Sequence, residues 1–184
     1  RGAIPVATLD EYFLDDYTVE EFQGVARTFR RPTKHASNPL VGNTGWTWDR
    51  DINFISAQKV GSAVTLCYMG VSAAAELYAC RATSTDGISF TKPNLGLISY
   101  GGNTNNNIML AARTTLIGFL YDATETPTYL GVGETVSGGG DDGVYLYSSS
   151  DGIAWTLIKT LYSGPLDGNY REGRAITRLA DGRY

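Results

Sequence analysis

Short runs of alternating apolar and polar residues cover most of the chain. Such runs predict β-strands, because successive side chains of a strand point to opposite faces of its sheet. One helical turn is expected over 16–22, where Thr18 and Glu21 have the spacing of a capping box. The expected strands, each ended by Gly, Asn, Asp or Pro, are 25–29, 52–57, 63–70, 77–84, 97–100, 108–112, 115–121, 129–133, 144–149, 156–162 and 175–179.

A repeat narrows the choice of architecture. No helical pattern of ten or more residues separates the strands, which leaves a sandwich, a barrel or a propeller. The stretch STDGISF at 84–90 returns as SSDGIAW at 149–155, so that Asp86 and Asp151 are 65 residues apart. That distance suits one four-stranded unit with insertions and favours a β-propeller, of which about three blades are expected here. Each copy is predicted to form a type I′ hairpin turn, which Asp-Gly favours.

Composition and charge exclude several classes of partner. The 184 residues include 22 Gly and 12 Tyr, a balance typical of strands and turns. The net charge is −4 and no basic block is present, so nucleic acid and anionic membrane surfaces are not expected as partners. No apolar run approaches the roughly 20 residues that span a bilayer, so membrane insertion is not expected. The chain opens on Arg1 and ends in ADGRY, a turn running into a strand, so we expect a piece of a longer protein.

The two cysteines lie in neighbouring expected strands. If the hairpin that joins these strands is centred between Ala73 and Ala74, Cys67 faces Cys80. Buried free thiols are the expected state, because free Cys packs as a small hydrophobe; a disulfide is the alternative.

Two segments resemble a known group. YFLDDYTVEEFQGVARTFRRPTKHASNPLV at 12–41 and YACRATSTDGISFTKPNLGLISYGGNTNNNIML at 78–110 resemble bacterial proteins related to the five-bladed β-propeller glycosidases, the clan that includes glycoside hydrolase families 32 and 43. The resemblance implies an all-β fold with a lead-in segment over 1–40 and a partial propeller over 41–184. It also implies that paired carboxylates cleave a glycosidic bond, one as base or nucleophile and one as acid.

In this clan three carboxylates from different blades meet at the mouth of the central funnel. The first corresponds to Asp51, just before the strand INFIS, with Asp49 as the alternate. The second corresponds to Asp122, directly after LIGFLY, and the third, the acid, to Glu172 in YREGRAITRL. The alternative for each carboxylate is an ordinary loop or turn residue.

Three further side chains are candidate sugar contacts. Trp48 could stack on a sugar face or pack within a blade. His35, the only histidine, could donate a hydrogen bond to a sugar or hold a loop. Arg174 stands where the family usually has Pro.

Two functions of different class follow. The first is a glycoside hydrolase-like propeller that acts on a polysaccharide or oligosaccharide without a cofactor. The alternative is a non-catalytic carbohydrate-binding or structural and adhesive propeller of a cell surface or virus particle. Carbohydrate is the expected partner, at an extracellular or surface-associated location. Convergence of the three carboxylates at one funnel mouth would favour the enzyme, and scattered carboxylates would favour the binding module.

Overall fold

The computed structural model of this protein describes residues 31–42, 48–135, 142–164, 176–177 and 179. The chain divides into two compact units, Arg1–His35 and Ala36–Tyr184. Residues 31–35 of the first unit are irregular and exposed. Every strand that the structure describes lies in the second unit, and the described residues contain no helix.

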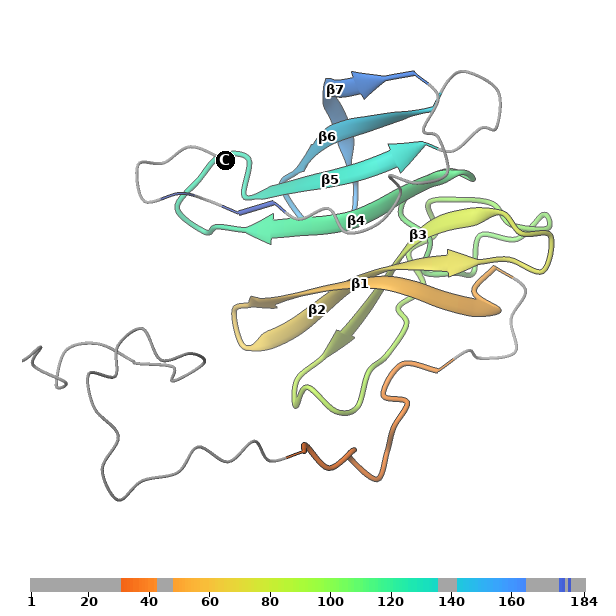
Figure 1. Cartoon of the computed structure of the whole chain (residues 1–184), viewed down its shortest axis with the longest axis vertical. Coiled ribbons are helices and arrows are strands. Elements are labelled where there is room, and N and C mark those ends of the chain that lie inside the picture. The colour runs from red at the N-terminus through yellow and green to blue at the C-terminus, as the bar shows by residue number, and fades with distance from the viewer. Residues whose placement is uncertain (1–30, 43–47, 136–141, 165–175, 178, 180–184) are drawn as a thin grey trace, which may run out of the picture. The chain divides into compact units, whose positions relative to one another are not determined.

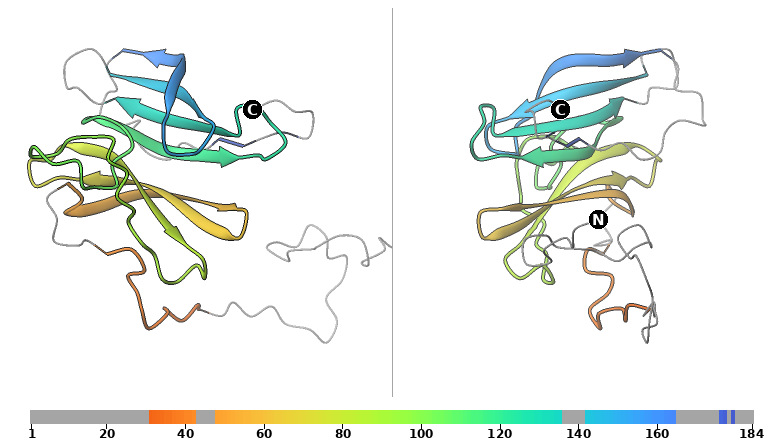
Figure 2. Two further views of the ribbon diagram at one scale, coloured as in Figure 1. Left: turned by 180° about the vertical axis from the view of Figure 1, so that it is seen from behind. Right: turned by 60° about the vertical axis from the view of Figure 1, so that its left-hand side comes forward.

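The second unit is an open, all-β arrangement whose strands follow chain order. Neighbouring strands are antiparallel except β3 and β4, which run parallel and pair only through Tyr78 and Thr114. The strands therefore form two antiparallel layers, β1–β3 and β4–β7, as Figures 1 and 2 show. Their bounds are β1 (Asp51–Val60), β2 (Ala63–Val71), β3 (Leu77–Ser84), β4 (Thr114–Tyr121), β5 (Tyr129–Thr135), β6 (Gly143–Ser149) and β7 (Thr156–Ser163).

Seven of the predicted strands are confirmed, and two are wrong. The segments 97–100 and 108–112 are irregular and belong to the connection between β3 and β4. This connection follows β3 closely: the Arg81 amide donates to the Asn107 carbonyl oxygen, and the Met109 amide to the Ala79 carbonyl oxygen. The Asn106 side chain donates to the Ile98 carbonyl oxygen and accepts from the Ile108 amide. Because an amide side chain replaces backbone partners, no regular ladder forms. The predicted strand 25–29 and helical turn 16–22 lie outside the described residues. Of the predicted strand 175–179, residues 176, 177 and 179 are described, and they are not part of a strand.

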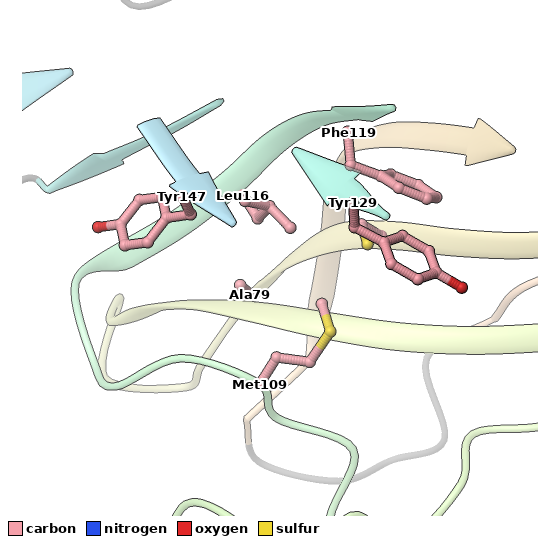
Figure 3. Packing of buried hydrophobic residues seen from close by; sticks show 7 residues of the cluster. Ala79, Met109, Leu116, Phe119, Tyr129 and Tyr147 are labelled. Atoms are coloured by element: carbon pink, nitrogen blue, oxygen red, sulfur yellow. The ribbon is translucent and has the colours of Figure 1, made fainter. Parts of the chain in front are cut away.

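The main core lies between the two layers. Gly133 of β5 packs under Thr115 and Tyr147, and a Cβ atom there would collide with the Thr115 carbonyl oxygen. The layers are also tied by Gln58 of β1, which donates to the Phe119 carbonyl oxygen, and by Arg81, which donates to the Gly152 carbonyl oxygen at 2.6 Å. The buried residues of this core, which Figure 3 shows, are Cys67, Ala79, Met109, Leu116, Phe119, Tyr129 and Tyr147.

A second core covers the other face of β1–β3. Val41, Trp48 and side chains of the segment 90–107, among them Phe90 and Tyr100, pack on this face as partly buried residues. The fully or nearly buried members are Leu66, Tyr68, Tyr78, Cys80, Ala82 and Ile108.

The two cysteines are buried free thiols, as expected, but they do not face each other. Cys67 pairs with Arg81, and Cys80 pairs with Tyr68, so the two thiols lie on opposite faces of the layer. The predicted register was wrong by one residue, because the loop between β2 and β3 has an odd number of residues. Such a loop is centred on a residue rather than between two.

The two Ser-x-Asp-Gly loops are structural repeats. Asp86 Oδ1 accepts from the amides of Ile88 (2.8 Å) and Ser89 (2.7 Å), while Ser84 Oγ accepts from the Gly87 amide (2.9 Å). Asp151 and Ser149 make the same bonds in the second copy. The predicted type I′ turn is wrong, because that turn needs positive φ at two residues and only the glycines have it, 73° at Gly87 and 67° at Gly152. Instead, hydrogen bonds from backbone amides to the Ser and Asp side chains hold each loop. The described residues thus hold two copies of this loop, and the expected number of about three blades stays a prediction.

Candidate functional site

Asp49 lies two residues before β1 and is completely buried. Its Oδ2 accepts from the Lys92 ammonium at 2.6 Å and from the Tyr68 hydroxyl at 3.0 Å. Lys92 is itself 15% exposed, whereas Asp49 is 0% exposed. Asp49 Oδ1 is buried without a hydrogen-bond partner among the described residues. Asp49 is therefore the centre of a buried ion pair and not a solvated loop residue.

This ion pair belongs to a wider buried network that joins residues before β1, the strands β2 and β3, and the connection between β3 and β4. Lys92 also donates to the Gly42 carbonyl oxygen at 2.7 Å. Asn107 donates from Nδ2 to the Tyr68 hydroxyl and to the Arg81 carbonyl oxygen, both at 2.7 Å. Burial, followed by the neighbouring Cys80 and Asp49, raises the pKa of Tyr68 far above its ordinary value. The Tyr68 hydroxyl therefore stays protonated and serves as a donor to Asp49.

Trp48 connects the network to a pocket. Its indole Nε1 donates to Asn107 Oδ1 at 2.9 Å, and its ring makes an edge contact with Tyr100 at 6.0 Å between centroids. A cavity of about 470 Å³ lies here. Its lining residues are Leu40, Val41, Gly42, Trp48, Phe90, Thr91, Lys92, Pro93, Asn94, Asn105, Asn106 and Asn107.

The pocket has an apolar wall and a polar rim. Asn106 and Asn107 are buried, and their amide groups are engaged in the hydrogen bonds described above. By contrast, Thr91, Asn94 and Asn105 are exposed. Aromatic and aliphatic side chains together with exposed amide and hydroxyl groups can hold an amphipathic ligand.

Asp51, the first residue of β1, is exposed at 56% of its side chain. Arg50 contacts its Oδ2 through Nε at 3.0 Å and through Nη2 at 2.8 Å. A pair this exposed contributes little to stability, so the carboxylate stays accessible to solvent and to a ligand.

Asp122 follows the last residue of β4 and shapes a turn. Its Oδ1 accepts from the Thr124 amide at 2.9 Å and from the Thr124 hydroxyl at 2.6 Å. The strand β1 is antiparallel to β2, which is antiparallel to β3, and β3 is parallel to β4, so β1 and β4 run in the same direction. Asp51 at the start of β1 and Asp122 at the end of β4 therefore lie at opposite ends of the sheet (Figure 1). A strand of this length is roughly 25 Å long, so the structure does not bring these two carboxylates together.

The remaining candidates have different positions. Glu172 and Arg174 lie outside the described residues. His35 is exposed and belongs to the first compact unit. Trp48 and Asp49, by contrast, lie together at the pocket and the network beneath it.

Sequence reasoning missed three network residues: Tyr68, Lys92 and Asn107. Lys92 could have been found from its position: it lies between Phe90 and Pro93, directly after the first Asp-Gly loop. For Asn107 the signal was an amide directly before the apolar run IML.

No group of three or more His, Cys, Asp or Glu side chains in the described ranges could hold a metal ion. Nor does any helix in those ranges have the length and apolar character that crossing a membrane requires.

No protein-family model matches the chain, and no curated protein matches it. Among solved structures, it is similar to a candidate glycoside hydrolase from Parabacteroides distasonis, with a TM-score of 0.49 and 18% identity over 70% of this chain and 41% of that one. A candidate glycoside hydrolase from Bacteroides ovatus gives 0.46 and 16%, over 72% of this chain and 41% of that one.

A third structure comes from the GH130 family of mannoside phosphorylases, which contains glycoside hydrolases that target β-1,2 mannosidic linkages in Candida mannan. It gives a TM-score of 0.46 and 13% identity, over 69% of this chain and 40% of that one. The chain thus spans about two fifths of the length of each of these proteins. Membership of the clan of families 32 and 43 stays a prediction.

Proposed function

We propose that this chain is part of a five-bladed β-propeller of the glycosidase-like type and that it binds carbohydrate in the pocket beside Trp48. The observation that carries the proposal is the composition of that pocket, in which an indole ring lies beside exposed amide and hydroxyl groups. Sugar rings have apolar C–H faces that pack on aromatic rings, and their hydroxyl groups exchange hydrogen bonds with amides.

The position of Trp48 also supports this proposal. The bond from its Nε1 to Asn107 Oδ1 joins it to a buried network, so the ring is held before any ligand arrives. A side chain that is already ordered loses less conformational entropy on binding, which favours affinity.

Binding of neutral oligosaccharides, measured by calorimetry after a glycan array, tests the proposal. Trp48→Ala and Asn105→Ala should weaken binding by about tenfold or more, because one removes the aromatic wall and the other a rim amide. Ile158→Ala is the matched control, since Ile158 is 50% exposed on β7, away from the pocket. Unchanged binding by the folded Trp48→Ala and Asn105→Ala variants, or the absence of any bound glycan, would contradict the proposal.

Hydrolysis of a glycosidic bond is the second candidate, and the exposed carboxylate of Asp51 at the start of β1 favours it. A carboxylate pair in a glycosidase must lie within about 10 Å, so Asp122 cannot be its partner. Glu172 is then the remaining candidate for the acid.

Release of reducing sugar from a panel of polysaccharides tests this second candidate. Asp51→Asn and Glu172→Gln should abolish hydrolysis, while Asp122→Asn, which retains an acceptor for its turn, should keep it. Equal loss of activity in the Asp122 variant would contradict this assignment. If no polysaccharide is cleaved, the binding proposal stands alone.

A further inference from the structure

The charge at the pocket is balanced. Among the described residues that line the pocket, Lys92 is the only charged one. Its ammonium lies 2.6 Å from Asp49 Oδ2, and the Asp49 side chain is completely buried. The positive charge that the pocket wall presents is therefore compensated by a negative charge directly behind it.

The ammonium is also engaged in its other directions. It donates to the Gly42 carbonyl oxygen at 2.7 Å and lies 5.5 Å from the centroid of the Tyr68 ring. An anionic group entering the pocket would have to draw this ammonium away from Asp49 and Gly42. It would also come close to the buried carboxylate, which repels it.

From this arrangement we propose that the pocket selects uncharged sugars and discriminates against sugars that carry carboxylate, sulfate or phosphate groups. The inference rests on the proposed carbohydrate site and names its ligand class. It makes Asp49 a specificity-determining residue: Asp49 cancels the charge of Lys92, although it does not itself line the pocket. A uronic or phosphorylated sugar would find no uncompensated cation among the described lining residues.

The Asp49→Asn variant isolates this effect. The amide oxygen of the asparagine can take the place of Asp49 Oδ2 and accept the bonds from Lys92 and Tyr68. The amide nitrogen would then take the place of Asp49 Oδ1, which has no partner in the described structure. The substitution thus removes one negative charge with little change in shape. It leaves the Lys92 cation uncompensated at the pocket wall, which should attract an anionic ligand.

Pairs of oligosaccharides that differ only in charge provide the probes: cello-oligosaccharides with their C6-oxidised uronic forms, and methyl-esterified oligogalacturonides with the free acids. Calorimetry at low and high salt should give the wild-type protein a preference of about tenfold or more for the neutral member of the bound pair. In Asp49→Asn this ratio should fall by at least about tenfold, and the gained affinity for the acid should weaken with salt. The double variant Asp49→Asn, Lys92→Met should restore the neutral preference.

Equal or tighter binding of the acidic sugar by the wild-type protein would overturn the inference and leave the proposed binding function intact. So would an unchanged ratio in a folded Asp49→Asn variant, as judged by circular dichroism and a cooperative melt. If no pair binds the folded wild-type protein and the glycan array also finds no bound glycan, the proposed function itself fails, and the inference with it. Should the variant fail to fold, the wild-type ratio and its salt dependence decide the matter.

Discussion

Removal of the Lys92 ammonium should strongly destabilise the β1–β3 layer. In Lys92→Met the long apolar stem is largely kept, but the bonds to Asp49 at 2.6 Å and to the Gly42 carbonyl oxygen at 2.7 Å are lost. The Asp49 carboxylate, 0% exposed, would then retain only the bond from the Tyr68 hydroxyl. Breaking a buried pair by removing one partner costs about 3–5 kcal/mol, a large fraction of the 5–15 kcal/mol typical of a folded domain.

The double variant Asp49→Asn, Lys92→Met separates the charge from the packing. It leaves no uncompensated buried charge, and the amide oxygen still accepts from Tyr68, so it should be more stable than Lys92→Met alone by about 2 kcal/mol. Urea unfolding followed by tryptophan fluorescence and circular dichroism measures both free energies of unfolding. Lys59→Met is the matched control: Lys59 is exposed on β1, and its loss should change stability by at most about 0.5 kcal/mol. A Lys92→Met protein as stable as the double variant would refute the reasoning, because it would mean that water or another group solvates Asp49.

Three further predictions concern the fold. Gly133→Ala should lower the free energy of unfolding, measured in urea, by about 1–3 kcal/mol, because its methyl group meets the Thr115 carbonyl oxygen and the Tyr147 ring. Gly61→Ala is the control: a Cβ atom there meets nothing within 4 Å, so this substitution costs only its backbone strain. Burial raises the pKa of Asp151, but the amides of Ile153 and Ala154 outweigh it, so the pKa is lowered overall. The stability that Asp151 contributes is therefore present above the pKa of the unfolded state, about 4, and is lost as the pH falls towards the lower pKa of the folded state. The decrease in Tm that this loss causes at acid pH should be absent in Asp151→Asn. Burial raises the pKa of Cys67 to about 12, and Cys80 is equally enclosed, so a maleimide probe should label neither thiol in the native protein and both in concentrated guanidinium, as mass spectrometry would show.

Strand positions could be predicted because each strand has its own local pattern. The strand 77–84 was predicted with the bounds that the structure gives it, and the other confirmed strands differ by a few residues at their ends. The segment 108–112 has the same local pattern but does not form a strand, because Asn106 and Asn107 satisfy backbone groups with their side chains. Local alternation cannot reveal that competition, since the two groups to which the Asn107 amide donates lie 26 and 39 residues away along the chain.

The candidate site was only partly predictable, for a different reason. The sequence places Trp48 and Asp49 beside a strand start, and both residues lie at the pocket or beneath it. The ammonium that pairs with Asp49 comes from a position 43 residues later, which no spacing rule would suggest. Asp51 and Asp122 were predicted from the residues next to each of them in the sequence. The distance between the two carboxylates depends instead on whether β1 and β4 run in the same direction, which those neighbouring residues do not reveal.

The repeat itself indicates which features belong to the fold and which are particular to one layer. The pairs Tyr68–Cys80 and Gly133–Tyr145 occupy equivalent register positions, since each residue of the second pair follows its counterpart by the repeat length. The loop residues Ser84 and Asp86 have identical counterparts in Ser149 and Asp151, which make the same hydrogen bonds and therefore serve the fold.

The network around Asp49 is not repeated. Tyr68 corresponds to Gly133, and Lys92 corresponds to Leu157, which is 50% exposed. In the second repeat the face equivalent to the pocket face is apolar and packs against the first layer. An apolar contact between layers requires no buried ion pair, and such a pair contributes little stability over an apolar replacement. The ion pair in the first repeat is therefore better explained by control of charge at the pocket than by the needs of the fold.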